Sequence, residues 1–155
     1  MLNNNYYDIA INELGYLQLQ IDSEYYNVMI ISCQQVSEKL LKSVAELCVS
    51  DEKIFKSHNL RQINTAICSN GIDLQLDDLE LAYLKDFYFD AGYPGDNFVE
   101  VKKYEFIKAL KIMYRVVNAA NKFRADKKLY TNYFEEKYPI NNLLDSAISS
   151  MDGSG

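Results

Sequence analysis

The amino-acid sequence predicts an all-α fold, an up-and-down helical bundle of about five to six helices. Two observations lead to this prediction. Apolar residues recur every three or four positions over most of the chain, and no segment shows the clean alternation of a half-buried strand. The chain has 155 residues, 48% of them hydrophobic and 25% charged, with only two prolines. We therefore expect a single helical domain over residues 1–150. Residues 151–155 form a tail, and its terminal GSG is either native or added by cloning.

The cysteines and the chain start predict the cellular compartment. Cys33, Cys48 and Cys68 follow no metal-ligand spacing and sit in apolar patterns, so we interpret them as reduced core thiols. No basic start followed by an apolar stretch opens the chain, and no apolar run approaches the roughly 20 residues of a membrane span. The sequence thus predicts a cytoplasmic protein with no membrane segment.

The first half of the chain predicts two helices. Residues 5–19 have apolar residues at mixed helical spacing, and Asp22 or Ser23 can cap the helix that follows. That second helix, from residue 24 to about residue 49, is predicted most clearly because its apolar residues step by three or four. Glu38 and Lys42, four residues apart, are expected to pair on its polar face. Its apolar set is Met29, Cys33, Val36, Leu40, Val44 and Leu47.

The middle of the chain predicts two further helices. Ser57 is the expected N-cap of a helix with Leu60, Ile63 and Ile67 on its buried side. The next helix ends at the loop GYPGDN, residues 92–97, where glycine and then proline stop it. Its start is acidic, and we interpret the carboxylates as partners of the helix dipole rather than as cation ligands. These acidic residues are Asp73, Asp77, Asp78 and Glu80.

A long helix over about residues 101–127 carries two contrasting faces. One is apolar and comprises Phe106, Leu110, Met113, Val117 and Ala120. The other is offset by two residues, or about 200°, and we call it the basic face: Lys108, Lys111, Arg115, Asn118 and Lys122. Residues 102–128 carry a local charge of +7, whereas the whole chain carries −6. A short helix over residues 141–151 is expected to finish the domain.

The remaining sequence excludes several kinds of chemistry. The chain has one histidine, His58, so a histidine-rich zinc site is excluded, and no recognisable nucleophile turn supports a catalytic triad. We expect His58 to cap or pack a helix rather than to act in catalysis. No glycine-rich phosphate loop is present, and neither a cofactor nor a metal is expected. The basic face is open to two interpretations, a phosphate-binding surface or a solvated helix surface.

Several segments together resemble HEPN domains (higher eukaryotes and prokaryotes nucleotide-binding). They are CQQVSEKLLKSV at 33–44, SHNL at 57–60, FYFDAGYPGD at 87–96, and the long last core helix with Arg115. The family pattern has a Gln-x-x-Glu-Lys-x-x-Lys stretch, a Thr/Ser-His-x-Leu helix start and a Tyr-rich helix that ends in Arg-Tyr-Pro. The first stretch falls on Gln35, Glu38, Lys39 and Lys42, the helix start on Ser57, His58 and Leu60, and the last pattern on Tyr88, Tyr93 and Pro94. The similarity spans about residues 5–125.

The resemblance implies a homodimeric helical bundle, which often works beside a minimal nucleotidyltransferase in a toxin–antitoxin pair. Many members are metal-independent ribonucleases that use an Arg followed, four to six residues later, by His on the last core helix. Arg115 stands where this Arg is expected, but Ala, Asn and Lys occupy residues 120–122, and Gly92 replaces an Arg common in the loop. Neither Arg nor Asn exchanges protons near neutral pH.

We therefore expect a dimeric, non-catalytic module that binds a nucleotide, RNA phosphates or a nucleotidyltransferase partner. The expected ligand-binding residues are Lys108, Lys111, Arg115, Asn118, Asn121 and Lys122. Two alternatives remain open. One is an active ribonuclease toxin that depends on Arg115, and the other is a purely structural module whose tyrosine-rich surface contacts a protein.

Overall fold

A computed structural model describes residues 5–90 and 100–131, without the side chains of residues 88–90. These residues form five α-helices and one 3₁₀ helix, and no strand occurs among them. In chain order the elements are α1 (Tyr6–Gln20), α2 (Tyr26–Ala45), η1 (Glu52–Lys56), α3 (Leu60–Ser69), α4 (Asp78–Asp90) and α5 (Lys103–Asp126). The predicted all-α fold is confirmed. The loop over residues 92–97 and the helix over residues 141–151 lie outside the described residues.

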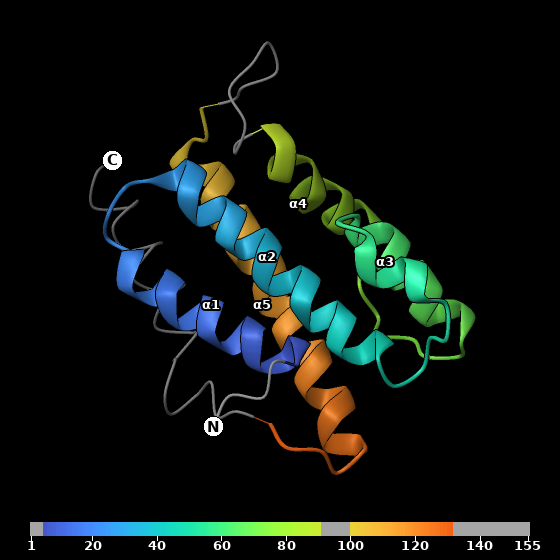
Figure 1. The fold of residues 1–155 in the computed structure, drawn as a ribbon. Helices are drawn as coiled ribbons and strands as arrows, with labels where there is room; N and C mark the ends of the chain where they lie inside the picture. The colour runs from blue at the N-terminus through green and yellow to red at the C-terminus, as the bar shows by residue number, and fades with distance from the viewer. Residues whose placement is uncertain (1–4, 91–99, 132–155) are drawn as a thin grey trace.

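Helix α2 is the centre of the bundle. The long helices α1, α2, α4 and α5 alternate in direction, and α3 lies beside the last turns of α2 (Figure 1). Helices α1, α3, α4 and α5 all pack against α2, with α1 and α5 making its most extensive contacts. A helix surrounded in this way has little surface left for solvent, so its polar side chains must find partners within the protein.

The predicted apolar stripes form most of the core. All five apolar residues predicted for α5 are buried, as are the three predicted for α3. In α2 the predicted residues from Met29 to Val44 are buried, but Leu47 lies beyond the helix end and is 50% exposed. Cys33 is buried as expected, whereas Cys48 is half-buried and Cys68 is exposed. The prediction of three core thiols is therefore correct only for Cys33.

Ser57 is not the N-cap of α3, contrary to the prediction, whereas an acidic residue does cap α4. Asn59, not Ser57, caps α3, and its side chain accepts a hydrogen bond from the backbone of Gln62. Ser57 Oγ instead accepts from the backbone of Asn59 at 3.0 Å, which shapes the turn before the cap. At α4, Asp77 Oδ1 accepts from the backbone nitrogens of Leu79 and Glu80. The acidic start of α4 therefore includes a real N-cap.

Helix α2 begins at a backbone turn rather than at either predicted cap. Its N-cap is Tyr25, which makes no side-chain capping bond. Ser23 Oγ does accept from the backbone of Tyr25 at 3.2 Å, two residues too early to cap the helix. Glu24 between them has φ +64°, the left-handed region that side chains other than glycine rarely adopt. This turn reverses the chain between α1 and α2.

Candidate functional site

The basic face of α5 is exposed along its whole length. Lys108, Lys111, Arg115, Asn118 and Lys122 are all solvent-exposed. The apolar stripe on the other side of the helix is buried against the core. The first and last members are fourteen residues apart, which corresponds to about 21 Å along the helix axis. A rigid helix therefore holds four cationic groups and one amide in a row.

The side chain of Arg115, in the middle of the basic face, forms an ion pair with Glu80. Its Nη1 atom contacts Oε2 of Glu80, which lies in the first turn of α4. The arginine side chain is 53% exposed and the glutamate side chain 28% exposed. This contact joins the two helices across solvent, where an ion pair adds little to stability. An incoming anion would compete with the Glu80 carboxylate for Arg115.

Lys108 lies over the ring of Tyr83, another α4 residue. Its Nζ atom is 4.2 Å from the ring centroid, a cation–π geometry. The Tyr83 hydroxyl donates a hydrogen bond to the backbone oxygen of Glu105 at 3.0 Å. Burial, and then the nearby Glu105 and Tyr104, raise the pKa of Tyr83 to about 12. Tyr83 thus stays protonated at neutral pH and holds the start of the basic face against α4.

The far end of the basic face borders a small cavity. Lys122 lines a cavity of about 200 Å³ between α5 and the segment that precedes α4. Asp73 and Asp126 also line it, so both signs of charge meet there. The volume suits water or part of a ligand, not a whole nucleotide.

Asn121 is turned away from the basic face. Its Oδ1 atom accepts a hydrogen bond from the hydroxyl of Tyr7 in α1 at 2.7 Å. Arg124, one turn later, lies over the ring of the same tyrosine at 4.0 Å. The structure therefore brings together five of the six predicted ligand-binding residues, and it engages Asn121 in joining α5 to α1.

A second polar cluster, in which Glu38 and Lys42 were predicted to pair on a polar face, is buried in α2. The side chain of Glu38 has no exposed surface, and that of Lys42 is only 3% exposed. The predicted Glu38–Lys42 pair does form, at 3.0 Å, but inside the protein rather than on a polar face. Lys39 contacts the same carboxylate oxygen at 3.1 Å, and Gln34 donates to the other oxygen at 3.2 Å.

His58 completes this buried cluster. Its Nδ1 atom lies 2.9 Å from Oε1 of Glu38, and its side chain is 46% exposed. Burial works to raise the pKa of Glu38, but hydrogen bonds from Lys42 and His58 and the charges of Lys39 and Lys42 outweigh it. The pKa of Glu38 therefore lies below its ordinary value. Because the ionised carboxylate is an acceptor, the His58 Nδ1 atom carries the hydrogen that it donates.

We call these residues the Glu38 cluster: Gln34, Glu38, Lys39, Lys42 and His58. The cluster connects the turn before α3 to α2. Gln34 also donates to the backbone oxygen of His58 at 3.3 Å, so the turn before α3 is held by two side chains of α2. The expected packing role of His58 agrees with this geometry. Four of the residues quoted for the HEPN resemblance, Glu38, Lys39, Lys42 and His58, thus meet at one point.

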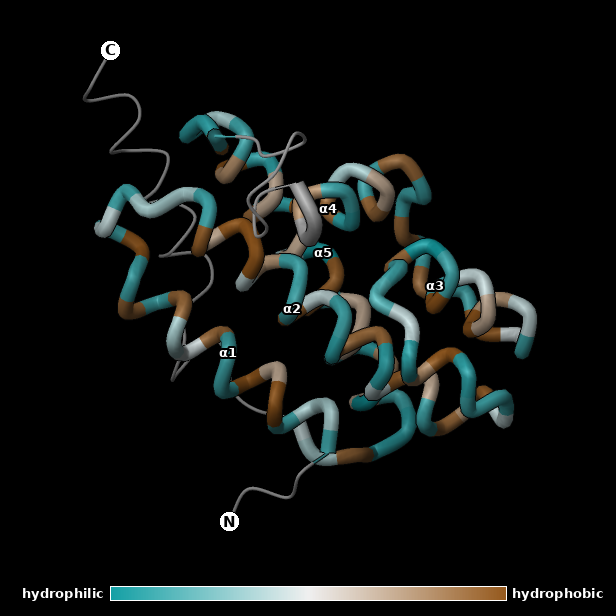
Figure 2. The backbone as a smooth tube through the Cα atoms, turned by 45° about the horizontal axis from the view of Figure 1, so that its top comes forward, coloured by the Kyte–Doolittle hydropathy of each residue, from teal (hydrophilic) through white to brown (hydrophobic). Residues whose placement is uncertain are grey.

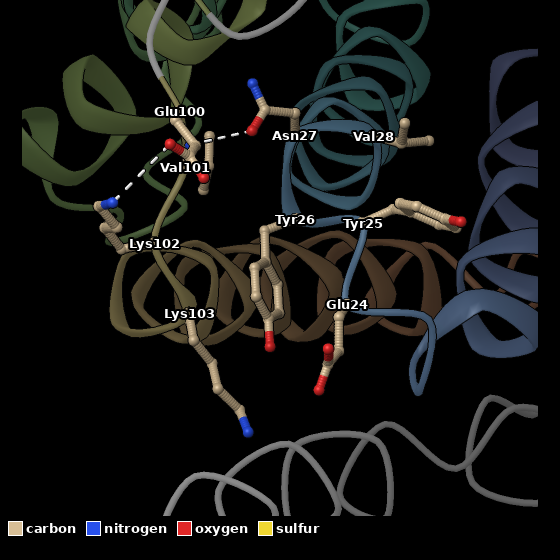
Figure 3. A pocket seen from close by; sticks show the side chains of 9 residues that line it. All are labelled: Glu24, Tyr25, Tyr26, Asn27, Val28, Glu100, Val101, Lys102 and Lys103. Carbon is tan, nitrogen blue, oxygen red and sulfur yellow. Dashed lines mark hydrogen bonds and ion pairs between the residues drawn. The ribbon is translucent and has the colours of Figure 1, made fainter.

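An open pocket lies at the other end of the bundle. It has a volume of about 370 Å³ and lies between the start of α2 and the start of α5. Figure 3 shows Tyr26 and Lys103 pointing to the same side of this pocket, with Glu24 beside them. The Asn27 side chain accepts a hydrogen bond from the backbone of Val101 at 2.9 Å and closes one wall. Lysines and glutamates both line the pocket, so it has no single charge preference.

Clusters of metal-ligating side chains and membrane-spanning helices are both absent from the described helices and loops. Within residues 5–90 and 100–131, no three His, Cys, Asp or Glu side chains are placed to share an ion. None of the described helices has both the length and the apolar content needed to cross a bilayer.

Comparison with known proteins identifies the family. Residues 4–123 match the family model of the HEPN domain, and the matched range contains α1 to α4 and nearly all of α5. No match was found among curated proteins or among solved structures. The matched range includes both the basic face and the Glu38 cluster. On the extent of this match, the chain belongs to the HEPN domain family.

Proposed function

We propose that this chain binds the phosphate groups of a nucleotide or an RNA through the basic face of α5. We further propose that it does so without the ribonuclease reaction. The observation that carries the proposal is the exposure of all five members of the basic face on one rigid helix. Membership of a family of nucleotide-binding helical domains is compatible with it.

The spacing of the basic face suits phosphate binding. Successive members are three or four residues apart, so their Cβ atoms are about 5 to 6 Å from each other. Several can therefore contact one polyphosphate or two adjacent phosphates of an RNA strand. Arg115 stands in the middle and can donate two parallel hydrogen bonds to one phosphate, which lysine cannot do. We assign Arg115 the central role in binding.

Binding should be measured with ATP, GTP and a short single-stranded RNA. The wild-type chain should bind at least one of them at low salt, and the logarithm of RNA affinity should fall with the logarithm of salt, with a slope near −0.7 per phosphate contact. The double variant Arg115→Ala, Lys122→Ala should bind at least about tenfold more weakly, because charge-assisted hydrogen bonds are lost.

The matched control removes two cations elsewhere. Lys53 and Lys56 are exposed residues of η1, so Lys53→Ala, Lys56→Ala changes the net charge equally without touching α5. This control should bind nearly as well as wild type. Absence of binding to all three ligands at low salt, or equal weakening by both double variants, would contradict the proposal and favour a structural module.

Ribonuclease activity of the family's usual kind should be absent. The single histidine of the chain lies at the start of α3, bonded to Glu38, and not on α5 after Arg115. Without it, no group on that helix exchanges the proton of a 2′-hydroxyl near neutral pH. Purified protein incubated with mixed RNA and EDTA should leave the RNA intact. Cleavage that disappears in Arg115→Ala would establish the ribonuclease alternative.

A further inference from the structure

An uncovered apolar strip runs along α1 and the first turn of α2. Its α1 members are Ile9, Tyr16 and Leu19, which are 38%, 55% and 84% exposed. They are seven and three residues apart and so share one face of the helix. Tyr25 and Val28 at the start of α2 are 70% and 48% exposed. In Figure 3 both point away from Lys102 and Lys103.

Helix α1 has the composition of a helix covered on two sides. Its inner face buries Tyr7, Ala10, Ile11, Leu14 and Leu17. Hydrophobic residues also recur between these positions along the length of α1 (Figure 2). Its only charged residues are Asp8 and Glu13, and Glu13 accepts a hydrogen bond from Ser32 of α2. Asn12 is exposed between Ile9 and Tyr16, but most of this outer row is hydrophobic. A helix with hydrophobic residues on opposite faces is normally buried on both.

The described chain ends beside this helix. After α5, Arg124 Nε donates a hydrogen bond to the backbone oxygen of Tyr130 at 2.8 Å. The ring of Tyr130 meets the ring of Tyr7 edge-on, with centroids 6.3 Å apart. The last described residue, Thr131, is therefore close to the first turn of α1, and residues 132–155 continue from that point.

The sequence beyond Thr131 contains a segment that matches the strip. Within residues 141–151, Leu143, Leu144, Ala147, Ile148 and Met151 recur at helical spacing, and the intervening residues are Asp and Ser. As a helix, these eleven residues would be about 16 Å long, and the strip from Ile9 to Leu19 spans about 15 Å. The connecting residues 132–140 can extend about 30 Å. The apolar pattern of residues 141–151, their length as a helix and the reach of residues 132–140 are therefore all compatible with packing on the strip.

We propose that residues 141–151 form an amphipathic helix that packs its apolar face on this strip of α1. The segment is part of the same chain, so its local concentration is set by a short tether and no second molecule is needed. This proposal is independent of the phosphate-binding function, because the strip lies on α1 and the basic face on α5.

Hydrogen exchange of the full-length protein tests the proposal. Amides of residues 143–151 should exchange at least about tenfold more slowly than in an unstructured peptide. In the variant Tyr16→Glu, Leu19→Glu this protection should be lost, whereas amides of α2 should remain protected. The second variant, Leu144→Ser with Ile148→Ser, changes the segment itself and should have the same effect.

The control variant is Leu79→Glu, Tyr104→Glu, which places the same charges on residues of α4 and α5 that are 78% and 64% exposed. It should keep the protection of residues 143–151. Exchange of the wild-type segment at unstructured rates, or protection that survives Tyr16→Glu, Leu19→Glu, would overturn the proposal. Protection that disappears on about hundredfold dilution would show that a second copy covers the strip instead.

Discussion

A carboxylate without exposed surface is tolerated in a folded protein only where cations and hydrogen-bond donors surround it. Glu38 meets this condition through Lys42, Lys39, His58 and Gln34. Because Lys42 is itself almost fully buried, each of the two charges depends on the other. Removing either Glu38 or Lys42 is expected to destabilise the fold, because the remaining buried charge then has no counter-charge.

Glu38→Gln should therefore destabilise the fold strongly. The variant keeps the shape of the side chain but leaves the buried Lys42 ammonium without its counter-charge, at an expected cost of about 3 kcal/mol. Urea unfolding followed by circular dichroism measures this change. Glu52→Gln, at an exposed glutamate of η1, is the control and should change stability by less than about 0.5 kcal/mol. If Glu38→Gln and Glu52→Gln had the same free energy of unfolding, the buried Lys42 would not depend on the charge of Glu38.

The same variant isolates a pH dependence. Because the pKa of Glu38 in the folded chain lies below its ordinary value of 4.5, folding favours the ionised form. This stabilisation is fully present above about pH 4.5 and is lost as the pH falls through the folded-state pKa. The stability difference between wild type and Glu38→Gln should thus shrink on acidification below pH 4.5. A difference that stays constant from neutral pH to pH 3 would contradict this.

At the scale of the element, α4 places a carboxylate against the basic face of α5. Its first turn, fixed by the Asp77 cap, holds the carboxylate of Glu80 on Arg115. A phosphate that binds Arg115 competes with this carboxylate, and displacing the carboxylate costs the energy of the ion pair. Glu80, one of the acidic residues at the start of α4, therefore competes with the proposed ligand for Arg115.

Glu80→Gln should strengthen phosphate binding about twofold to fivefold, because an exposed ion pair of this kind is worth up to about 1 kcal/mol. The measurement is the titration described above, performed at low salt. Asp78→Asn provides a matched control: it removes one negative charge from the same turn, but Asp78 pairs with Arg61 of α3 and not with Arg115. An equal gain in affinity in Glu80→Gln and Asp78→Asn would mean that binding responds to net charge and not to the Glu80–Arg115 ion pair.

Helix α2 shows where prediction from the sequence succeeded and where it failed. The pairing of Glu38 with Lys42 follows from a spacing of four residues, which the sequence displays. The burial of this pair does not follow from the spacing, because the polar side of α2 is covered by helices that come later in the chain. The signal that was available is the breadth of the apolar surface: Ile30, Leu41 and Ala45 lie outside the predicted stripe and are all buried. Such a broad surface is typical of a central helix.

Helix α5 shows the opposite case. Its apolar stripe and basic face were both predicted at the right positions, because this helix packs on one side only and the period of 3.6 residues separates the two faces. The contact of Arg115 with Glu80 could not be predicted, since it depends on how α4 lies beside α5. Asn121 was assigned to ligand binding, but its contact with Tyr7 joins residues from opposite ends of the chain.

At the scale of the whole molecule, we expect a homodimer. Family membership supports this, and so does the number of tyrosines, since the chain has 13 of them and no tryptophan. Tyr104 and Tyr130, which lie outside the apolar strip of α1 and α2, are both more than half exposed, as is common for residues at protein interfaces.

Light scattering at tens of micromolar protein decides the oligomeric state. The expected mass is twice 17.9 kDa, and a mass of 17.9 kDa would contradict the dimer. Tyr104→Glu should shift the equilibrium toward monomer, whereas Tyr16→Glu, on the strip proposed to be covered by residues 141–151, is the control and should not. If Tyr104→Glu leaves the dimer intact, the interface does not include this part of α5.

The hydrogen bond between Tyr7 and Asn121 also has a consequence for synthesis of the protein. Its two partners are 114 residues apart in the sequence. Translation proceeds at roughly 5 to 20 residues per second, so roughly 6 to 23 s pass between the addition of Tyr7 and the addition of its partner. During this interval the buried tyrosine of α1 lacks the acceptor that it has in the folded protein. The nascent chain can pair α1 with α2 early, but it completes this end of the bundle only after most of α5 has been made.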